Sequence, residues 1–203
     1  MKKKLTGASF GILGDSYSTF NGHIPEGNRC FYPSPERVDD VLTVEQTWWH
    51  ILMTRNDMRL LANDSYSGAT VCVGLGTYTE RVKRSFSEAI QADFIFVFGG
   101  TNDNKRDKIV GQVQYGDWTE EDLKQVLPAF CYVLDYVSQH NPQATIVVPI
   151  NTGFKPELHA GIVEAAEHYG AVAVCLADID KKSGHPSALG MQQIAQQIEQ
   201  ALQ

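Results

Sequence analysis

Short apolar runs recur along the chain, separated by segments with helical periodicity. Five of them are almost continuously hydrophobic, and they cover Ala8–Leu13, Met58–Ala62, Phe94–Phe98, Thr145–Pro149 and Ala171–Leu176. Strands of this kind are typical of a parallel sheet, because both faces of such a sheet are covered. The pattern therefore predicts five strands that are buried on both sides.

Amphipathic patterns fill the intervals between these runs. Thr43–Gln46 has the form of a capping box and predicts a helix that continues to about Thr54. Thr119 and Asp122 predict the start of a second helix, in which Pro128 should cause a kink. Further helices are expected over residues 156–169 and from Ser187, which would be the N-cap of the last one.

This alternation of strands and helices predicts an α/β fold built as a three-layer α/β/α sandwich with right-handed crossovers. In such a sheet, ligands bind at the carboxyl ends of the strands. The residues that directly follow each strand are therefore the first candidates for a functional site.

Composition narrows the function classes. The 203 residues fit one domain, 1–203, with 43% hydrophobic and 20% charged residues. Seventeen Lys and Arg against 24 Asp and Glu give a net charge of −7. Because nucleic acid and anionic membranes are bound through Lys and Arg, neither is an expected partner.

The cysteines and the N-terminus indicate a reducing compartment. Cys30, Cys72, Cys131 and Cys175 are far apart, so we expect small core residues and no metal site. Three lysines precede the first apolar run, which is too short for a signal peptide or a membrane span. We expect a cytoplasmic protein whose oligomeric state stays open.

Candidate catalytic residues follow four of the predicted strands. Ser16 lies in the turn after the first strand, Gly68 follows the second and Asn102 follows the third. His185 lies between the last strand and the last helix, at the same edge, and its imidazole suits general base work on a serine. A serine, a histidine, a glycine N–H and an asparagine amide are the parts of an acyl-transfer site.

These segments resemble the SGNH (GDSL-type) hydrolase family, in order and over nearly the whole chain. The matching residues are Gly14–Ser18, Gly68, Gly99–Asp103 and the pair His185-Pro186. The resemblance implies a flavodoxin-like five-stranded parallel sheet and an esterase, lipase or carbohydrate deacetylase that needs no metal or other cofactor.

The resemblance also implies a role for each matching residue. Ser16 would be the nucleophile and His185 the base. The N–H groups of Ser16 and Gly68 and the side-chain amide of Asn102 would form the oxyanion hole. Asp15 and Asp103, by contrast, are expected to brace their turns rather than to transfer protons.

One position departs from the family pattern. The family usually has an aspartate three residues before the histidine, where this chain has Lys182. An ammonium group cannot accept the Nδ1–H of the imidazole as a carboxylate does. Asp180 or Asp178 could take over if the loop is longer, or a backbone carbonyl could serve in a Ser-His dyad; we favour Asp180.

Two long loops, Asn21–Asp40 and Asn104–Asp117, should lie beside the serine and shape the pocket. In the first, Arg29, Phe31 and Tyr32 are the candidate contacts to a small-molecule ester substrate. Two rival functions remain: a catalytically impaired ligand-binding domain, for which Lys182 is the main argument, and an acyltransferase that uses a sugar hydroxyl in place of water.

Overall fold

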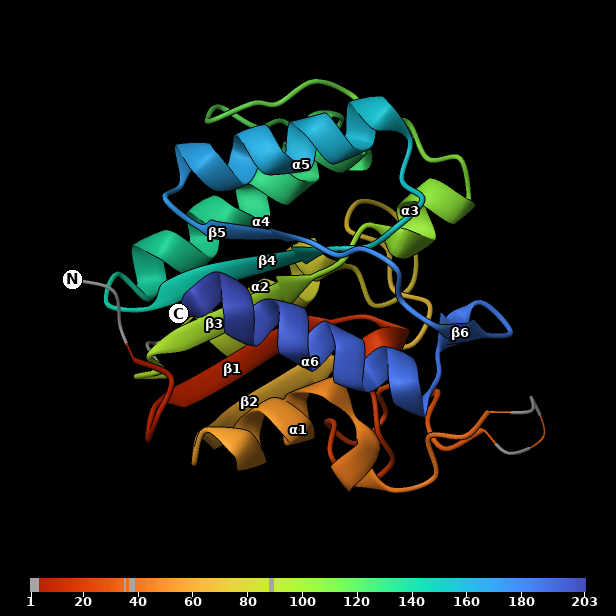
Figure 1. Cartoon of the computed structure of the whole chain (residues 1–203). Helices are drawn as coiled ribbons and strands as arrows, with labels where there is room; N and C mark the ends of the chain where they lie inside the picture. The colour runs from red at the N-terminus through yellow and green to blue at the C-terminus, as the bar shows by residue number, and fades with distance from the viewer. Residues whose placement is uncertain (1–3, 35, 37–38, 88–89) are drawn as a thin grey trace.

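The protein is built on one five-stranded parallel sheet. The computed structural model describes residues 4–34, 36, 39–87 and 90–203. The strand order is β2-β1-β3-β4-β5 (Figure 1). The strands are β1 (Ser9–Gly14), β2 (Arg59–Ser65), β3 (Phe94–Phe98), β4 (Thr145–Ile150) and β5 (Val172–Cys175). The predicted fold class is confirmed, although β2 continues three residues past the predicted end, through Asn63-Asp64-Ser65.

Helices cover both faces of the sheet. Helices α1 (Trp48–Arg55) and α6 (Ala188–Leu202) pack on one face, and α2 (Tyr78–Phe86), α4 (Val126–His140) and α5 (Pro156–His168) pack on the other (Figure 1). Along β3, Phe94, Phe96 and Phe98 join the first core while Ile95 and Val97 join the second. This alternation within an unbroken apolar run is what a strand buried on both faces requires.

The carboxyl ends of the strands are followed by short elements that carry the candidate residues. The 3₁₀ helix η1 (Ser16–Ser18) follows β1, and α3 (Thr101–Lys105) follows β3. A two-stranded antiparallel hairpin of β6 (Lys181–Lys182) and β7 (His185–Pro186) lies between β5 and α6. Figure 1 shows α3 and this hairpin at the same end of the sheet.

Several helix predictions need correction. Thr43–Gln46 leads into the 3₁₀ helix η3 (Val44–Gln46), whereas α1 begins at Trp48 and is capped by the Thr47 hydroxyl. Likewise, the Thr119 and Asp122 pair opens only the 3₁₀ helix η4 (Asp122–Lys124). Pro128 is the third residue of α4, where a backbone N–H has no intrahelical acceptor, so it does not interrupt the helix.

Other expectations are met in part. Ser187 is the N-cap of α6, as predicted, and its hydroxyl accepts from the Gly190 N–H at 3.1 Å. All four cysteines are free; Cys72 and Cys131 are buried, but Cys175 is exposed rather than a core residue. Among the described residues, no helix is both long and apolar enough to cross a membrane.

Candidate active site

The candidate nucleophile Ser16 and the candidate base His185 meet at the carboxyl edge of the sheet, although 169 positions separate them in the chain. The Oγ of Ser16 lies 3.0 Å from Nε2 of His185. Ser16 begins η1, and the Asp15 carboxylate caps this turn by accepting from the Tyr17 N–H at 2.9 Å. The pair has the separation that proton transfer from a hydroxyl to an imidazole requires.

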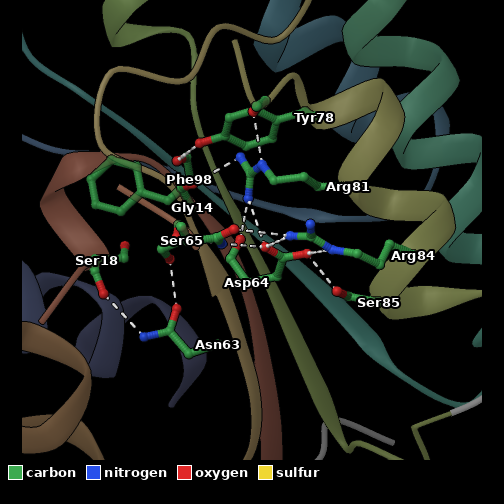
Figure 2. A network of polar contacts seen from close by, with 12 residues as sticks. Gly14, Ser18, Asn63, Asp64, Ser65, Tyr78, Arg81, Arg84, Ser85 and Phe98 are labelled. Atoms are coloured by element: carbon green, nitrogen blue, oxygen red, sulfur yellow. Dashed lines mark hydrogen bonds and ion pairs between the residues drawn. The ribbon is translucent and has the colours of Figure 1, made fainter. Parts of the chain in front are cut away.

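The turn after β1 is also anchored from the core. The Trp48 Nε1–H donates to the Ser18 hydroxyl at 3.2 Å, and the Trp49 Nε1–H donates to the Ser18 carbonyl at 3.1 Å. The Asn63 side-chain amide donates to the same carbonyl at 3.0 Å (Figure 2). Both indoles are buried, so these bonds fix the turn that carries Ser16.

Aromatic residues hold His185 in place. The Tyr17 hydroxyl donates to the carbonyl of Gly184 at 3.0 Å, and the Tyr32 hydroxyl donates to the carbonyl of Pro186 at 2.8 Å. The two bonds thus fix the backbone on either side of the histidine. The Phe31 ring stacks on the imidazole, with ring centroids 3.6 Å apart and an interplanar angle of 13°.

This arrangement revises the predicted substrate contacts. Phe31 and Tyr32 are buried, with 6% and 0% of their surface exposed, and they pack against His185 instead of lining an open pocket. Arg29 is exposed, and its carbonyl accepts from the Ser67 N–H at 2.7 Å. Residues 35, 37 and 38 of the same loop lie outside the described residues.

Asp180 does not contact the imidazole. Its carboxylate accepts from the Ser187 hydroxyl at the start of α6, and Asp178 is exposed in a left-handed conformation. The Nδ1 of His185 instead lies 3.4 Å from the carbonyl oxygen of Ser183. The backbone-carbonyl alternative therefore matches the geometry better than the aspartate that we favoured.

The tight hairpin turn explains this difference. Ser183 and Gly184 connect β6 to β7, and both have positive φ, 48° and 77°. Two successive residues with positive φ are typical of a type I′ turn, which reverses the chain within two residues. This turn brings the Ser183 carbonyl close to the His185 imidazole. The Lys182 ammonium points elsewhere and pairs with Asp40 at 2.7 Å.

The three groups that the sequence suggests as oxyanion donors have N–H bonds to spare. Among the described residues, the backbone N–H groups of Ser16 and Gly68 donate to no acceptor. Gly68 has φ 85°, a conformation that favours glycine. One N–H of the Asn102 amide bonds the Ala69 carbonyl at 2.9 Å, which leaves its second N–H for a ligand.

The loop that carries Gly68 is fastened to α3. The buried Asp103 carboxylate accepts from the Val71 N–H at 2.9 Å and from the Cys72 N–H at 3.4 Å. The Arg106 guanidinium donates to the Gly68 carbonyl at 3.0 Å. Asp103 thus fastens the loop after β2 to α3, which agrees with the expectation that it braces its turn, and burial raises its pKa.

Helix α2, which the sequence pattern did not reveal, clamps the ends of three strands (Figure 2). The Arg81 guanidinium is buried; it donates to the Gly14 carbonyl at the end of β1, at 3.0 Å, and to the Asp64 carbonyl in β2. The Tyr78 hydroxyl donates to the Phe98 carbonyl at the end of β3, at 2.5 Å. These strands lead directly into the segments that carry Ser16, Gly68 and Asn102.

The clamp has its own anionic partner. The buried Asp64 carboxylate pairs with Arg84 at 2.7 Å and Arg81 at 3.5 Å, and it accepts from Ser85 and Asn28 (Figure 2 shows the two arginines and Ser85). Burial alone would raise the pKa of Asp64, but the bonds from Ser85 and Arg84 and the charge of Arg81 lower it. Asp64 therefore balances the buried charge of Arg81.

The pKa of Asp15 is shifted in the opposite direction to that of Asp64. Its carboxyl is fully buried directly before the nucleophile, and burial raises its pKa to about 7, against the lowering effects of the Tyr17 N–H and the Arg81 charge. It caps the turn and makes no contact with His185. We therefore regard it as a brace for the turn and not as a proton carrier.

Sequence reasoning missed two polar residues beside the site. Asn151 follows β4, is buried, and donates to the Tyr17 hydroxyl and to Thr101 Oγ1, both at 3.2 Å. Lys181 begins β6 and donates to the Asn151 side-chain oxygen at 3.1 Å. The signal for Asn151 was its place directly after the fourth strand, the position that singled out the other candidates.

The second long loop lies beside α4 and α5. Residues 110–114 border a cavity of about 570 Å³ together with Asp122, Gln125, Pro128 and Glu157. Tyr115 stacks on His168 of α5 at 3.7 Å, and the Trp118 ring packs edge-on against Tyr132 of α4 at 5.5 Å. In the described part of the chain, no three His, Cys, Asp or Glu side chains are grouped to hold a metal ion.

Comparisons with known proteins agree with this architecture. A family model for GDSL-like lipase/acylhydrolase matches residues 8–202. A protein from Bacteroides uniformis designated a GDSL-like lipase is 40% identical, with a TM-score of 0.88 over 96% of this chain and 94% of that chain. A protein of the same designation from Bacteroides ovatus is also 40% identical, with a TM-score of 0.88 over 96% and 97% of the two chains.

A more distant likeness concerns the fold alone. An acetyl xylan esterase from Butyrivibrio proteoclasticus is 16% identical, with a TM-score of 0.60 over 96% of this chain and 63% of that chain. No curated protein matches the chain.

Proposed function

Because the chain belongs to the GDSL-like lipase/acylhydrolase family, we propose that it is a serine hydrolase that cleaves a carboxylic ester through an acyl-enzyme on Ser16. The observation that carries the proposal is the 3.0 Å contact between Ser16 Oγ and His185 Nε2, beside unused N–H groups of Ser16 and Gly68 among the described residues. A nucleophile, a base and oxyanion donors are what acyl transfer requires.

The first step is attack on the ester carbonyl. His185 removes the Ser16 proton as Oγ bonds to the carbonyl carbon, and the carbonyl oxygen becomes an oxyanion. The N–H groups of Ser16, Gly68 and Asn102 stabilise that charge. His185 then returns the proton to the leaving alcohol as the tetrahedral intermediate collapses to the acyl-enzyme.

The second step repeats the first with water as the nucleophile. His185 takes a proton from the water molecule as it attacks the acyl carbonyl, and the same donors hold the second oxyanion. Collapse of this intermediate returns the proton to Ser16 and releases the acid. The sequence of steps uses only groups of this chain, the substrate and one water molecule.

We propose that the Ser183 carbonyl accepts the Nδ1–H of His185 and so sets the tautomer of the imidazole. An Nδ1–H directed at the Ser183 carbonyl, 3.4 Å away, leaves the lone pair of Nε2 facing the Ser16 hydroxyl. The Phe31 ring and the hydroxyls of Tyr17 and Tyr32 help to hold the imidazole in this orientation.

Turnover of a short nitrophenyl ester tests the proposal. We expect hydrolysis by the wild-type protein and loss of it in Ser16→Ala and in His185→Ala, with unchanged far-UV circular dichroism. A wild-type protein that turns over no ester would favour the ligand-binding alternative. Product analysis with an added sugar acceptor separates a hydrolase from an acyltransferase, since an acyltransferase passes the acyl group to the sugar in preference to water.

A further inference from the structure

Lys181 brings a positive charge to the edge of the candidate site. Its ammonium group donates to the Thr152 hydroxyl at 2.8 Å and to the Asn151 side-chain oxygen at 3.1 Å, and it lies 5.8 Å from the centroid of the Tyr17 ring. In the hairpin, Lys181 pairs with Pro186. The residue is partly buried, so it is not a freely solvated surface lysine.

The residues around Lys181 are the chain neighbours of the candidate catalytic pair. Tyr17 directly follows Ser16, and Pro186 directly follows His185. The Tyr17 ring also lies 5.6 Å from the His185 ring, between centroids. The Tyr17 ring therefore contacts both the ammonium group of Lys181 and the imidazole of His185.

The oxyanion side of the site is equally close. Asn151, which accepts from Lys181, donates to the hydroxyl of Thr101 at 3.2 Å, and Thr101 directly precedes Asn102. Asn151 thus links Lys181 to the segment that carries the candidate oxyanion donor Asn102.

The charge of Lys181 has no counter-ion in the described part of the chain. Burial is the cause that lowers its pKa. The next residue, Lys182, is exposed and pairs with Asp40 at 2.7 Å. Partial desolvation of a cation costs free energy that an ion pair offsets, so an anion supplied from outside would complete the surroundings of Lys181.

A second cation strengthens the argument. Arg106 places its guanidinium on the Gly68 carbonyl at 3.0 Å, is exposed, and forms no ion pair among the described residues. The chain as a whole carries a net charge of −7, so two cations without an ion pair among the described residues are notable near the candidate site. Such local charge attracts anionic ligands.

We propose that Lys181 is a specificity-determining residue, which binds a carboxylate on the substrate and gives the protein a preference for anionic esters. The inference rests on the proposed esterase function. The ammonium group has three N–H donors, of which two are used by Asn151 and Thr152, so one remains for the substrate carboxylate.

Two matched pairs of esters test the proposal. 4-Nitrophenyl hydrogen succinate and its methyl ester differ in a charge on the acyl part, and 4-acetoxybenzoate and its methyl ester differ in a charge on the leaving alcohol. For each pair, the ratio of kcat/KM for the anionic ester to that for the neutral ester is measured after subtraction of the uncatalysed rate. In the wild-type protein we expect this ratio to exceed one in at least one pair and to fall as salt is added.

Substitutions at Lys181 and Lys182 show which lysine causes the preference for the anionic ester. We expect Lys181→Gln to lower the ratio about tenfold, mainly through KM, the size typical of one charge-assisted hydrogen bond. Lys181→Arg should retain most of it, and Lys182→Gln, which removes an equal charge from the same hairpin, should leave it within about twofold. This control distinguishes a bound carboxylate from a general change in net charge.

The outcomes that overturn the proposal are distinct from those that overturn the esterase function. Hydrolysis of both neutral esters with ratios that are the same in the wild type and Lys181→Gln would refute a role for Lys181 and leave the esterase function in place. An equal loss in Lys182→Gln would also refute it. Failure to hydrolyse all four esters would overturn the esterase function and this inference together.

Discussion

Replacement of Arg81 by methionine would test whether the α2 clamp holds the candidate site together. The substitution keeps a long apolar side chain but removes the buried guanidinium, which bonds the carbonyl groups of Gly14, Asp64 and Gly76. Gly14 lies two positions before the nucleophile, and Asp64 lies four positions before the oxyanion glycine. Both loops therefore lose a common attachment.

The size of the effect follows from burial. Removal of one partner from a buried hydrogen-bonded ion pair typically costs about 3–5 kcal/mol. Asp64 keeps its bonds from Arg84, Ser85 and Asn28, so we expect the lower half of that range. For a chain of this length, each kcal/mol lowers Tm by roughly 2–4 °C, so a loss of about 3–4 kcal/mol should lower Tm by roughly 6–16 °C. At a temperature where the variant is folded, kcat should fall by about ten- to a hundredfold, because small displacements of reacting groups are costly.

Thermal denaturation and ester turnover measure the two effects. Arg84→Ala is the matched control: Arg84 belongs to the same network, but 54% of its side chain is exposed, so its ion pair should contribute little. We expect this control to keep wild-type kcat and to lose at most about 1 kcal/mol. If Arg81→Met kept the wild-type Tm and kcat, the clamp would have no role in positioning the site.

Three further predictions concern the carboxylates and the oxyanion donors. Asp180→Asn should leave kcat within about twofold but lower the unfolding free energy by about 1 kcal/mol through the Ser187 cap, whereas loss of a triad aspartate costs about 10⁴ in kcat. Asn102→Ala should lower kcat about 10²–10³-fold, the effect of one oxyanion donor, with a modest loss of stability from the Ala69 bond; wild-type turnover would remove it from the site. Burial raises the pKa of Asp15 to about 7, so the folded protein holds its proton more tightly than the unfolded chain. This contribution to the unfolding free energy is fully present below about pH 4 and is lost as pH rises through 7. In Asp15→Asn, urea melts at pH 4.5 and 7.5 should therefore show a smaller loss of stability with rising pH than in the wild type, and an equal loss would contradict the assignment.

The sheet could be predicted from the sequence because its strands are apolar at nearly every position. By contrast, α2 was missed because its buried face includes Arg81, and because apolar periodicity cannot reveal a buried arginine whose partners are backbone carbonyls. Pro128 was misinterpreted for a related reason. Its effect depends on whether it lies in the first turn or the middle of a helix, and that depends on where the helix begins.

The candidate catalytic residues could be predicted from the sequence, but the residues that hold them in position could not. Position after a strand was enough to bring Ser16 and His185 together. The acceptor for His185 could not be predicted, since a two-residue turn with positive φ at Ser183 decides which group reaches Nδ1. Phe31 was expected to contact substrate. Aromatic residues in loops either bind substrate or pack against the protein itself, and only the structure shows that Phe31 stacks on His185.

Covalent labelling tests the central claim most directly. The protein is incubated with a fluorophosphonate probe, digested, and the modified residue is located by mass spectrometry. The account predicts a stoichiometric adduct on Ser16, and a strong decrease in its rate of formation in His185→Ala. Absence of an adduct from folded wild-type protein, or an adduct on another serine, would contradict it.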